Sequence, residues 1–351
     1  MGAELLITRQ QAPPAAASAT QVLERFRQPI EAVLRRVLAE RSGPMYDMLG
    51  YHLGFDGAGP AQGKAFRPTL CLLVCEALGG PWQKALPAAA SIELIHNFSL
   101  IHDDIQDGDR LRRGRPTLWT QWGVPQAINA GDAMFCLATL TLAELRPQFE
   151  DELVVEVMSV LQEATREMIE GQYLDVRYEA VPQVGLTEYL EMIRCKTGAL
   201  LRASIEIGAQ LAGAGPPFRL RCRRFGEAIG RLFQIRDDML GVWGESEATG
   251  KPVGSDIKRK KKSLPIVMAL SLAGQAEREA LLSMYSQEMI SDADVDRIQQ
   301  TFERLDVKAR VQALADEAHS QAMDLAAAIH FSDQGRAELV SLVNFLLERD
   351  H

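Results

Sequence analysis

The sequence predicts an all-α protein, folded as one large bundle of helices around a central cavity. Alanine and leucine are abundant and aromatic residues make up only 6% of the chain, a balance that favours helices over sheets. No stretch alternates apolar and polar residues for long enough to indicate a strand, and no linker divides the 351 residues into two cores. With 47% hydrophobic residues, the chain is able to bury a substantial core as a single domain.

The chain begins with a tail and continues as a single helical domain. Residues 1–20 include a low-complexity run of Gln, Pro and Ala, so we expect this tail to be disordered and the domain to fill residues 21–351. From Val22 to Val37, apolar residues recur at helical spacing and predict the first helix. Glycine and proline over 54–63 then indicate a loop.

Helices account for most of the chain after this loop. One begins near Arg67 and ends at Leu78, and the next runs over 85–107, ahead of a polar turn at 108–116. Residues 242–262 are rich in glycine and lysine and predict a second loop. The other predicted helices cover 127–145, 151–175, 186–213, 218–240 and 264–272, with more helices to the end.

Composition excludes several classes of protein. The formal net charge of −9 argues against non-specific nucleic-acid binding. No apolar run reaches the ~20 residues that a membrane-spanning helix needs, and the N-terminus does not have the pattern of a secretory signal. The cysteines are odd in number and lie in apolar settings, which indicates reduced, buried thiols in a cytoplasmic protein. They are Cys71, Cys75, Cys136, Cys195 and Cys222.

Two carboxylate clusters carry the strongest indication of chemistry. In the first, Asp103 and Asp107 are one helical turn apart, so both carboxylates project from one face, where their oxygens suit Mg²⁺. Asp104 is rotated about 100° from Asp103. The alternative is a solvated helix end. The apolar run over 92–101 favours a buried helix, in which like charges are costly without a cation, but both interpretations stay open at this point.

The second cluster is Asp237-Asp238, and basic segments accompany both clusters. Arg112 and Arg113 closely follow the first cluster, and guanidinium groups bind two phosphate oxygens at once. Lys64 and Arg67 lie at the entry to a helix, and a helix N-terminus favours anions. The glycine spacing of a P-loop is missing. Carboxylates that suit Mg²⁺, surrounded by cations, indicate a diphosphate substrate.

Taken together, these motifs resemble the trans-polyprenyl diphosphate synthases, in particular those that make farnesyl or geranylgeranyl diphosphate. The resemblance extends from about Gly63 to Pro265 and implies the isoprenoid synthase type I fold. So many separate motifs in the family's order are hard to obtain by chance. The residues that carry the resemblance are Gly63-Lys64 with Arg67-Pro68 and His96, Asp103 to Asp107 with Arg112-Arg113, Lys196-Thr197, Phe233-Gln234 with Asp237-Asp238, and Gly250-Lys251 with Gly254, Asp256 and Lys261.

Two features depart from the family pattern. The second motif usually ends in a third aspartate, and that position is Gly241 here, so we expect weaker or altered metal binding on that side. The run from Lys258 to Lys262 is unusually basic, and only Lys261 matches the family's lysine. The other cations of this run are interpreted as a solvated surface.

The resemblance implies head-to-tail (1′–4) transfer of an allylic group to isopentenyl diphosphate. It implies that Mg²⁺ on Asp103, Asp107 and Asp237 binds the allylic diphosphate, whose departing pyrophosphate is stabilised by Arg112, Lys196 and Lys261. It further implies that Lys64, Arg67, His96 and Arg113 bind isopentenyl diphosphate, that Thr197 and Gln234 orient the proton loss, and that Lys251 lies in a lid over 242–262.

Several of these residues also have plainer interpretations. His96 is either a ligand-facing or a core histidine, and Thr197 is either catalytic or bonded to its own helix backbone. Lys196 lies in an apolar segment and needs an anion if it is buried. Asp175 is expected to support the cavity or to be an ordinary polar residue of its helix. Asp132 is expected to be structural.

Product length depends in this family on the residues just before Asp103. A large Phe98 beside a small Ser99, one turn deeper on the same helix, would partly close the pocket. The family pattern for this arrangement is the twenty-carbon geranylgeranyl diphosphate, with fifteen and twenty-five carbons left open.

Two other functions are compatible with a similar scaffold. A class I terpene synthase would ionise the same substrate without isopentenyl diphosphate, and the basic residues near Lys64 and Arg113 argue against it. A non-catalytic subunit of a heteromeric synthase would explain Gly241, and the intact first motif argues against it. A homodimer is expected on the family resemblance alone.

Overall fold

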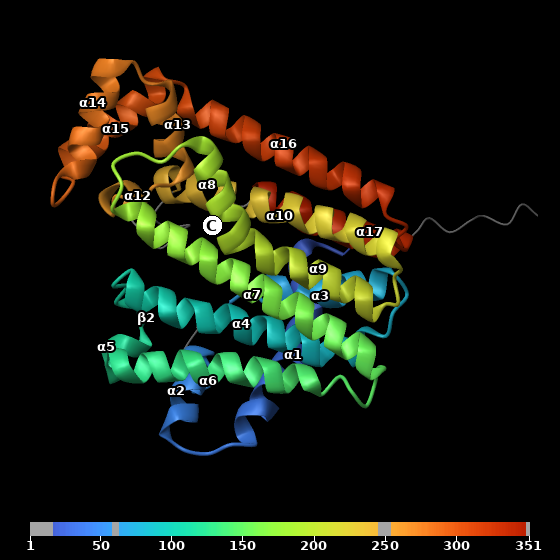
Figure 1. Ribbon diagram of the computed structural model, residues 1–351. Coiled ribbons are helices and arrows are strands. Elements are labelled where there is room, and N and C mark those ends of the chain that lie inside the picture. Colours follow the sequence, from blue (N-terminus) through green and yellow to red (C-terminus); the bar gives the residue numbers. More distant parts are fainter. Residues whose placement is uncertain (1–16, 58–62, 245–253, 349–351) are drawn as a thin grey trace, which may run out of the picture.

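The structure is a computed structural model that describes residues 17–57, 63–244 and 254–348. Nearly all of the chain that it describes is helical (Figure 1). The strands in these ranges are the two-residue β1 (Leu111–Arg112) and β2 (Arg115–Pro116), paired antiparallel in one hairpin. The predicted all-α fold is therefore confirmed. No helix in the described ranges is both long and apolar enough to cross a membrane.

The first half of the chain contributes nine helices or helical turns to the described ranges. They are α1 (Ala19–Ala39), α2 (Pro44–His52), α3 (Phe66–Ala77), a 3₁₀ turn (Trp82–Ala85), α4 (Leu86–Gln106), α5 (Leu118–Trp122), α6 (Val124–Ala143), α7 (Asp151–Glu179) and α8 (Leu186–Ile193).

The second half begins with a π-helical turn (Arg194–Gly198), which leads directly into α9 (Ala199–Leu211). The helices that follow it are α10 (Pro216–Trp243), α12 (Ser255–Lys258), α13 (Leu264–Leu272), α14 (Gln275–Ser286), α15 (Asp292–Arg304), α16 (Val307–Ala328) and α17 (Asp333–Glu348).

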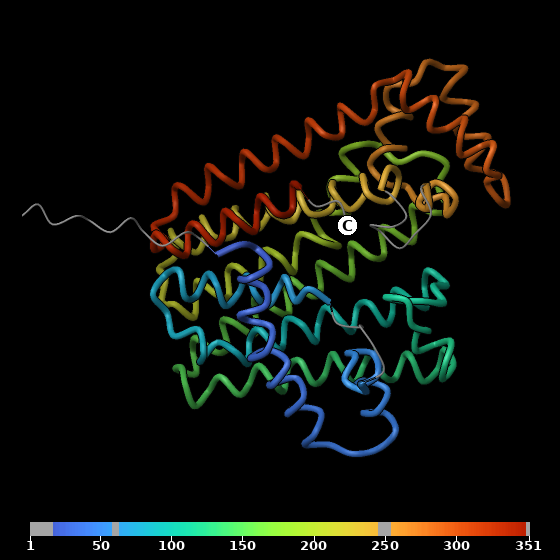
Figure 2. Tube along the Cα trace, turned by 180° about the vertical axis from the view of Figure 1, so that it is seen from behind, coloured from blue at the N-terminus to red at the C-terminus, as the bar shows by residue number. Residues whose placement is uncertain are grey.

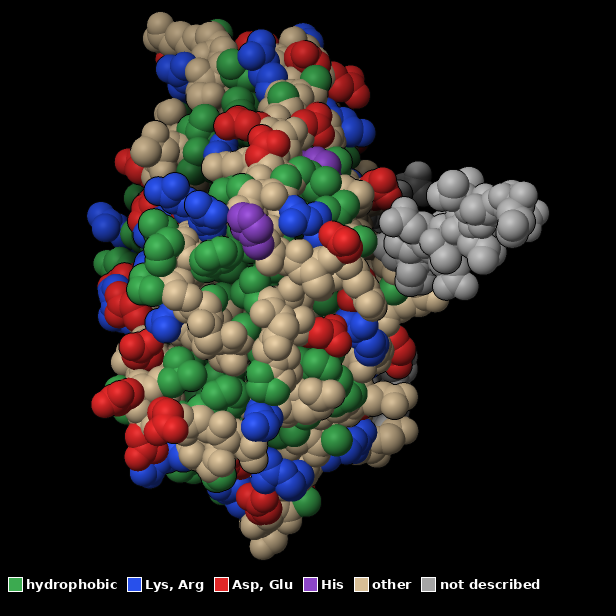
Figure 3. Space-filling model, turned by 90° about the vertical axis from the view of Figure 1, so that its right-hand side faces the viewer, with side chains coloured by type: hydrophobic (Ala, Val, Ile, Leu, Met, Phe, Trp, Pro, Cys, Tyr) green, Lys and Arg blue, Asp and Glu red, His purple; other side chains and the backbone are tan. Residues whose placement is uncertain are grey.

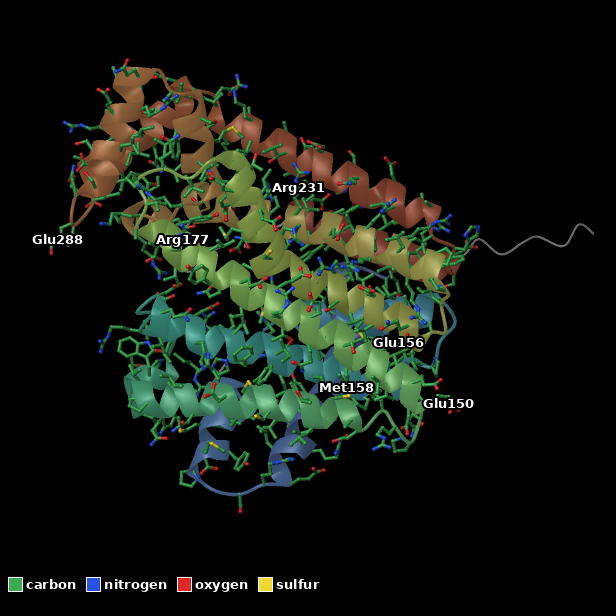
Figure 4. All side chains as sticks on the ribbon, in the orientation of Figure 1. Glu150, Glu156, Met158, Arg177, Arg231 and Glu288 are labelled. Carbon is green, nitrogen blue, oxygen red and sulfur yellow. The ribbon has the colours of Figure 1, made fainter. Side chains whose placement is uncertain are left out.

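Helices α4, α6, α7, α10 and α16 lie side by side with their axes roughly aligned, whereas α1 crosses the bundle steeply (Figures 1 and 2). Helix α4 packs against α6 and α3, α9 packs against α3, α7 and α10, and α16 covers α10. Helix α7 spans the length of this bundle, from Glu150, Glu156 and Met158 to Arg177 (Figure 4). Helices α14 and α15 project at one end, where Glu288 lies at the tip. The face at the opposite end carries acidic, basic and apolar side chains intermixed (Figure 3).

Most predicted helices are found, with differences at their ends. Helix α1 begins at Ala19, with Ser18 and Gln21 forming a capping box, so the last residues assigned to the tail are helical. The rest of that tail, residues 1–16, lies outside the described residues. Helix α2 was not predicted. The predicted helix over 186–213 is interrupted by the π turn, and the predicted loop over 242–262 contains α12.

All five thiols are free, as predicted, but they are not all buried. Cys71, Cys75, Cys195 and Cys222 are buried in the core. Cys136 is exposed, which contradicts the prediction, because the face of α6 that carries it points away from the helices that α6 covers.

A close approach between α7 and the π turn sets the geometry of the bundle's centre. A Cβ atom placed on Gly171 of α7 would lie 2.1 Å from the backbone nitrogen of Lys196. Only glycine therefore permits this contact without a backbone shift. The π turn inserts an extra residue per turn at this point, and such insertions are frequent at functional sites. It carries Lys196 and Thr197.

We expect Gly171→Ala to destabilise the protein by about 1–3 kcal/mol, because the added methyl group would overlap backbone atoms of the π turn and force a backbone shift. The shift of the thermal unfolding midpoint measures this effect. Gly50→Ala in α2 is the matched control, since a Cβ there meets no atom within 4 Å. Gly50→Ala should unfold at the same or a higher temperature. Equal midpoints for the two variants would contradict the close-approach argument.

Candidate active site

A cavity of about 770 Å³ opens in the middle of the bundle, between α4, α6, α7, the π turn and α10. Most of the predicted site residues line it. They are Arg67, His96, Phe98, Ser99, Asp103, Arg112, Arg113, Lys196, Thr197, Gln234 and Asp237. A larger cavity of about 1220 Å³, bounded by α8, α10 and α16, is lined by none of them. Size alone therefore does not identify the site.

The other predicted residues lie around this cavity. Lys64 lines an adjoining cavity of about 380 Å³ together with Arg67, His96 and Arg113. Asp107 follows the last residue of α4, and Lys261 Nζ lies 3.9 Å from Asp107 Oδ2. Lys251 lies outside the described residues.

The first acidic wall is the end of α4. Burial in the cavity wall raises the pKa of Asp103 to about 6, with the positive charge of Lys196 opposing this shift and the negative charge of Asp107 contributing to it. The Asp103 side chain is half-buried and lines the cavity. A cation at this wall would relieve the repulsion between the two carboxylates. This is the electrostatic setting that favours binding of a divalent metal ion.

Asp104 points away from this wall and holds Arg112. The Asp104 carboxylate is buried, and its Oδ1 accepts hydrogen bonds from Nε and Nη2 of Arg112, both at 2.8 Å. Burial raises the pKa of Asp104 to about 6, with Arg112 acting in the opposite direction. Arg112 also lines the cavity, so its guanidinium is held at the wall as a fixed positive charge.

Lys196 is already paired with an anion. Its ammonium donates a hydrogen bond to Asp175 of α7. Burial alone would lower the pKa of Lys196, but the negative charges of Asp175 and Asp103 outweigh it, so the pKa is raised. The sequence-based requirement for an anion is met, and Asp175 supports the cavity. The ammonium therefore stays charged beside Asp103.

A chain of hydrogen bonds fixes the second acidic wall on α10. Thr197 Oγ1 donates to Gln234 Oε1 at 2.6 Å, and Gln234 Nε2 donates to Asp238 Oδ1 at 2.8 Å. The buried Asp238 also accepts hydrogen bonds from the Tyr189 hydroxyl and from the Leu264 backbone nitrogen, the latter at 2.6 Å. Asp238 is thus a structural residue that orients Gln234, while Asp237 faces the cavity.

Burial determines the protonation of Asp238. It raises the pKa of this carboxyl group to about 7, against the opposing effects of the Leu264, Tyr189 and Gln234 hydrogen bonds. The negative charge of Asp256 contributes to this shift. Tyr189 was missed by the sequence reasoning, because nothing in its local sequence indicates that α8 would place its hydroxyl beside α10.

The adjoining cavity is basic. Arg67 Nη1 lies 3.3 Å from His96 Nε2. Burial, followed by the charges of Arg67 and Arg113, lowers the pKa of His96 well below its usual range, so the neutral ring accepts this hydrogen bond. Lys64 Nζ lies 5.1 Å from the centre of the Phe345 ring. With Arg113, these groups concentrate positive charge around one cavity, a setting that suits an anion.

The backbone around this basic surface is tightly constrained. A Cβ atom on Gly63 would lie 2.6 Å from Arg113 Nη2, and Arg113 itself has a positive φ of 52°. The buried Glu93, which accepts a hydrogen bond from Asn97, contributes negative charge nearby.

A buried histidine, His52, was missed by the sequence reasoning. Its pKa is lowered to about 3 by burial and by the charges of Arg112 and Arg113.

Residues 254–263 approach the end of α4, where the first acidic wall lies. Arg259 Nη2 is 2.7 Å from Asp109 Oδ1 and 3.9 Å from Asp107 Oδ2, so it reaches the first acidic wall alongside Lys261. Arg259 was interpreted from the sequence as part of a solvated surface, and its contacts correct that interpretation. Lys260 has a positive φ of 55°, and its Nζ donates to the backbone oxygen of Gln287 at 2.8 Å.

Phe98 narrows the cavity away from the acidic walls. Its ring centre lies 5.4 Å from that of Phe135 on α6 and 5.3 Å from that of His102. Ser99 lines the cavity too, and its Oγ donates to the His96 backbone oxygen at 2.8 Å. Phe135 was missed because α6 carries no motif. Asp132, taken as structural, also lines this part of the cavity.

The donor set suits a hard divalent cation. In the described ranges, no group of three or more His, Cys, Asp or Glu side chains is close enough to hold a metal ion by itself. Asp103, Asp107 and Asp237 instead contribute carboxylate oxygens from two walls. Mg²⁺ is commonly bound in this way, by one or two carboxylates plus the phosphates of a substrate and water. The residues therefore fit Mg²⁺ that arrives with a diphosphate.

Comparison with known proteins supports the same interpretation. Residues 57–302 match the polyprenyl synthetase family over most of the domain. The chain belongs to this family. The resemblance inferred from the sequence motifs is thus confirmed, and with it the assignment to the prenyltransferases, a class of transferase.

Relatives in this family differ in product. The chain is 39% identical over 323 residues to a (2E,6E)-farnesyl diphosphate synthase of Mycobacterium tuberculosis, covering 90% of this chain and 89% of the relative. It is also 39% identical over 282 residues to a geranylgeranyl diphosphate synthase of the same species, covering 79% of each protein. The family is therefore established, and the product length is not.

Solved structures share the fold. A polyprenyl synthetase from Streptomyces coelicolor has a TM-score of 0.86 and 36% identity, covering 93% of this chain and 99% of that one. A geranylgeranyl pyrophosphate synthase from Corynebacterium glutamicum, complexed with isoprenyl diphosphate and magnesium, has a TM-score of 0.82 and 25% identity, covering 95% and 100%.

Protonation of Asp103 should compete with metal binding. Because the pKa of Asp103 is raised to about 6, its carboxylate is ionised at pH 8 and about half protonated near pH 6, and a metal ion binds the ionised form. We expect the affinity for Mn²⁺ in the presence of pyrophosphate, measured by electron paramagnetic resonance, to fall about tenfold per pH unit below pH 6. Asp103→Asn should bind weakly at every pH. A wild-type affinity that is unchanged between pH 7 and pH 5 would contradict this assignment.

Proposed function

We propose that the protein condenses an allylic diphosphate with isopentenyl diphosphate, head to tail, to give a short-chain prenyl diphosphate. The proposal rests on one observation: a cavity with carboxylates on two walls adjoins a second cavity that is lined by basic side chains. Asp103 and Asp237 face each other from α4 and α10, while Lys64, Arg67 and Arg113 surround the adjoining basic cavity. A metal-dependent diphosphate site beside a metal-free anion site suits two diphosphate substrates.

Loss of pyrophosphate from the allylic substrate is the step that the acidic walls serve. Mg²⁺, when bound, supplies positive charge to the leaving pyrophosphate. Lys196 and Arg112 add two fixed cations at the cavity wall, each held by its own carboxylate partner, Asp175 and Asp104. Charges held in place before the reaction need no reorganisation as negative charge develops on the leaving group.

The basic cavity positions the second substrate. Lys64, Arg67, His96 and Arg113 bind the diphosphate of isopentenyl diphosphate, so that its double bond faces the allylic cation. The apolar side chain of Phe233, which lines both cavities, keeps water from the cation. After the new C–C bond forms, Thr197 and Gln234, fixed by their mutual hydrogen bond, orient the proton that is lost to the departing pyrophosphate.

One assay separates this function from its alternatives. Purified protein is incubated with Mg²⁺, farnesyl diphosphate and labelled isopentenyl diphosphate. Label in a longer prenyl diphosphate supports the proposal. A hydrocarbon formed without isopentenyl diphosphate would instead identify a class I terpene synthase, and absence of any turnover, with geranyl and dimethylallyl diphosphate tested as well, would identify a non-catalytic subunit.

We further propose that geranylgeranyl diphosphate is the main product. The growing chain would extend past Asp103 along α4, toward the cavity end where the rings of Phe98 and Phe135 pack together. Ser99, on the same wall, leaves space that a larger side chain would fill. A cavity closed at this depth supports twenty carbons over a longer product.

Phe98→Ala should lengthen the product, because it removes the ring that closes the cavity end. Chromatography of the dephosphorylated prenols is the measurement, and we expect at least one further five-carbon unit. Phe149→Ala, which removes a partly buried ring of the core at the start of α7, is the control and should leave the product unchanged. An unchanged product from Phe98→Ala would rule out this ring as the floor.

We also propose a homodimer, in the cytoplasm, with α6 and α7 at the interface. Large apolar side chains are exposed on these two helices: Leu140, Val155, Ile169, Tyr173 and Val176. Three of them also line the active-site cavity on its α7 side. A partner covering this surface would bury the apolar patch and close that wall of the cavity. Light scattering gives the mass that tests the dimer.

A further inference from the structure

Residue 241 is the position of the second acidic wall that lacks a carboxylate, and the space beside it is filled. Gly241 lies one turn after Asp237 on α10, so a side chain there would project on the same face. A Cβ atom placed on Gly241 would lie 2.0 Å from Asp256 Oδ2 and 2.5 Å from Asp256 Cγ. The carboxyl carbon of an aspartate is about 1.5 Å from its own Cβ. The Asp256 carboxylate thus occupies the volume that an aspartate at residue 241 would occupy.

This placement follows from how α12 is anchored. On one side, Ser255 Oγ donates to the Gly241 backbone oxygen at 3.4 Å. On the other, Lys258 pairs with Asp292 at the start of α15, and the side chain of Ile257 is buried. Asp256 is therefore held against α10 by contacts on both sides of the short helix.

The same segment reaches both acidic walls with opposite charges. Arg259 and Lys261 lie beside Asp107 on the first wall, and Asp256 lies beside Gly241 on the second. The two cations thus lie at the first wall, where one helical turn carries two carboxylates. The anion lies at the second wall, which lacks a carboxylate at residue 241. This distribution of charge favours a role for Asp256 in the site over a role as an ordinary first-turn residue of α12.

We propose that Asp256 supplies the third carboxylate of the second acidic wall, binding the Mg²⁺ ion on the Asp237 side or its water ligands. The inference rests on the proposed function, because that ion is the one that accompanies the allylic diphosphate. It revises the expectation drawn from Gly241 in the sequence. Asp256, from the segment 254–263, completes the second wall. The metal affinity of that wall therefore depends on how this segment docks against α10.

The test compares four proteins: wild type, Asp256→Asn, Asp256→Ala, and the double variant Gly241→Asp/Asp256→Ala, in which the alanine vacates the volume that the new aspartate needs. The measurement is Mn²⁺ affinity in the presence of pyrophosphate, by electron paramagnetic resonance, which needs no turnover. We expect Asp256→Asn to weaken Mn²⁺ binding about tenfold or more. The double variant should recover most of this loss, because the carboxylate returns to the same volume from α10. Asp296→Asn, the same change at an exposed carboxylate of α15, is the control and should bind as wild type does.

Two results would overturn the inference: Asp256→Asn binding Mn²⁺ as tightly as wild type, or a folded double variant that binds no better than Asp256→Ala. Asp256→Asn is nearly isosteric, so it decides the question even if the double variant fails to fold. The proposed function fails independently, when wild type makes no prenyl product. A protein that lost Mn²⁺ binding on Asp256→Asn but never condensed the two substrates would support the inference and contradict the function.

Discussion

Negative charge held in a half-buried cavity is the constraint on which the rest of this site depends. Asp103 and Asp107 share one turn of α4, and burial makes their mutual repulsion stronger than it would be in water. The protein's own cations offset it only in part: Lys196 is shared with Asp175, Arg112 is paired with Asp104, and Arg259 and Lys261 each lie 3.9 Å from Asp107. The surplus negative charge is left for a metal ion and the diphosphate that comes with it.

Rigid support for this charge comes from a network of hydrogen bonds around the buried Asp238. Asp238 accepts hydrogen bonds from Gln234, Tyr189 and the backbone of Leu264, which join α10 to α8 and to the start of α13. Three segments far apart in sequence are thereby fixed at one carboxylate. Truncating a buried group of this kind leaves its partners without hydrogen bonds, which costs more than the bond itself contributes.

Local patterns in the sequence were sufficient for the helices and for the residues that belong to motifs. The one-turn spacing of Asp103 and Asp107 placed both on one face, and the basic residues around Lys64 and Arg113 indicated the second anion site. Residues that act through tertiary contacts could not be found in this way. Phe135 and Tyr189 belong to helices without motifs, and only packing brings Phe135 to the cavity and Tyr189 to Asp238.

Other differences arose because one local pattern is compatible with two structures. Residues 186–213 have an unbroken helical pattern, and the π turn within them depends on the close approach of Gly171 to Lys196. Gly241 was interpreted as a loss, since its sequence gives no sign that Asp256 would fill the space. The sequence shows that residue 241 has no carboxylate, whereas only the fold shows that the Asp256 carboxylate lies in the adjoining space.

The left-handed backbone at Lys260 has a consequence for how this enzyme can vary. A non-glycine residue in that conformation costs about 1–2 kcal/mol, yet a lysine occupies it, and its ammonium binds the Gln287 carbonyl at the end of α14. Together with the ion pair between Lys258 and Asp292, this hydrogen bond connects the turn that carries Arg259 and Lys261 to the hairpin of α14 and α15. None of the predicted site residues lies in that hairpin. Mutations in α14 or α15 can therefore change the activity without touching the cavity, because they change the positions of Arg259 and Lys261.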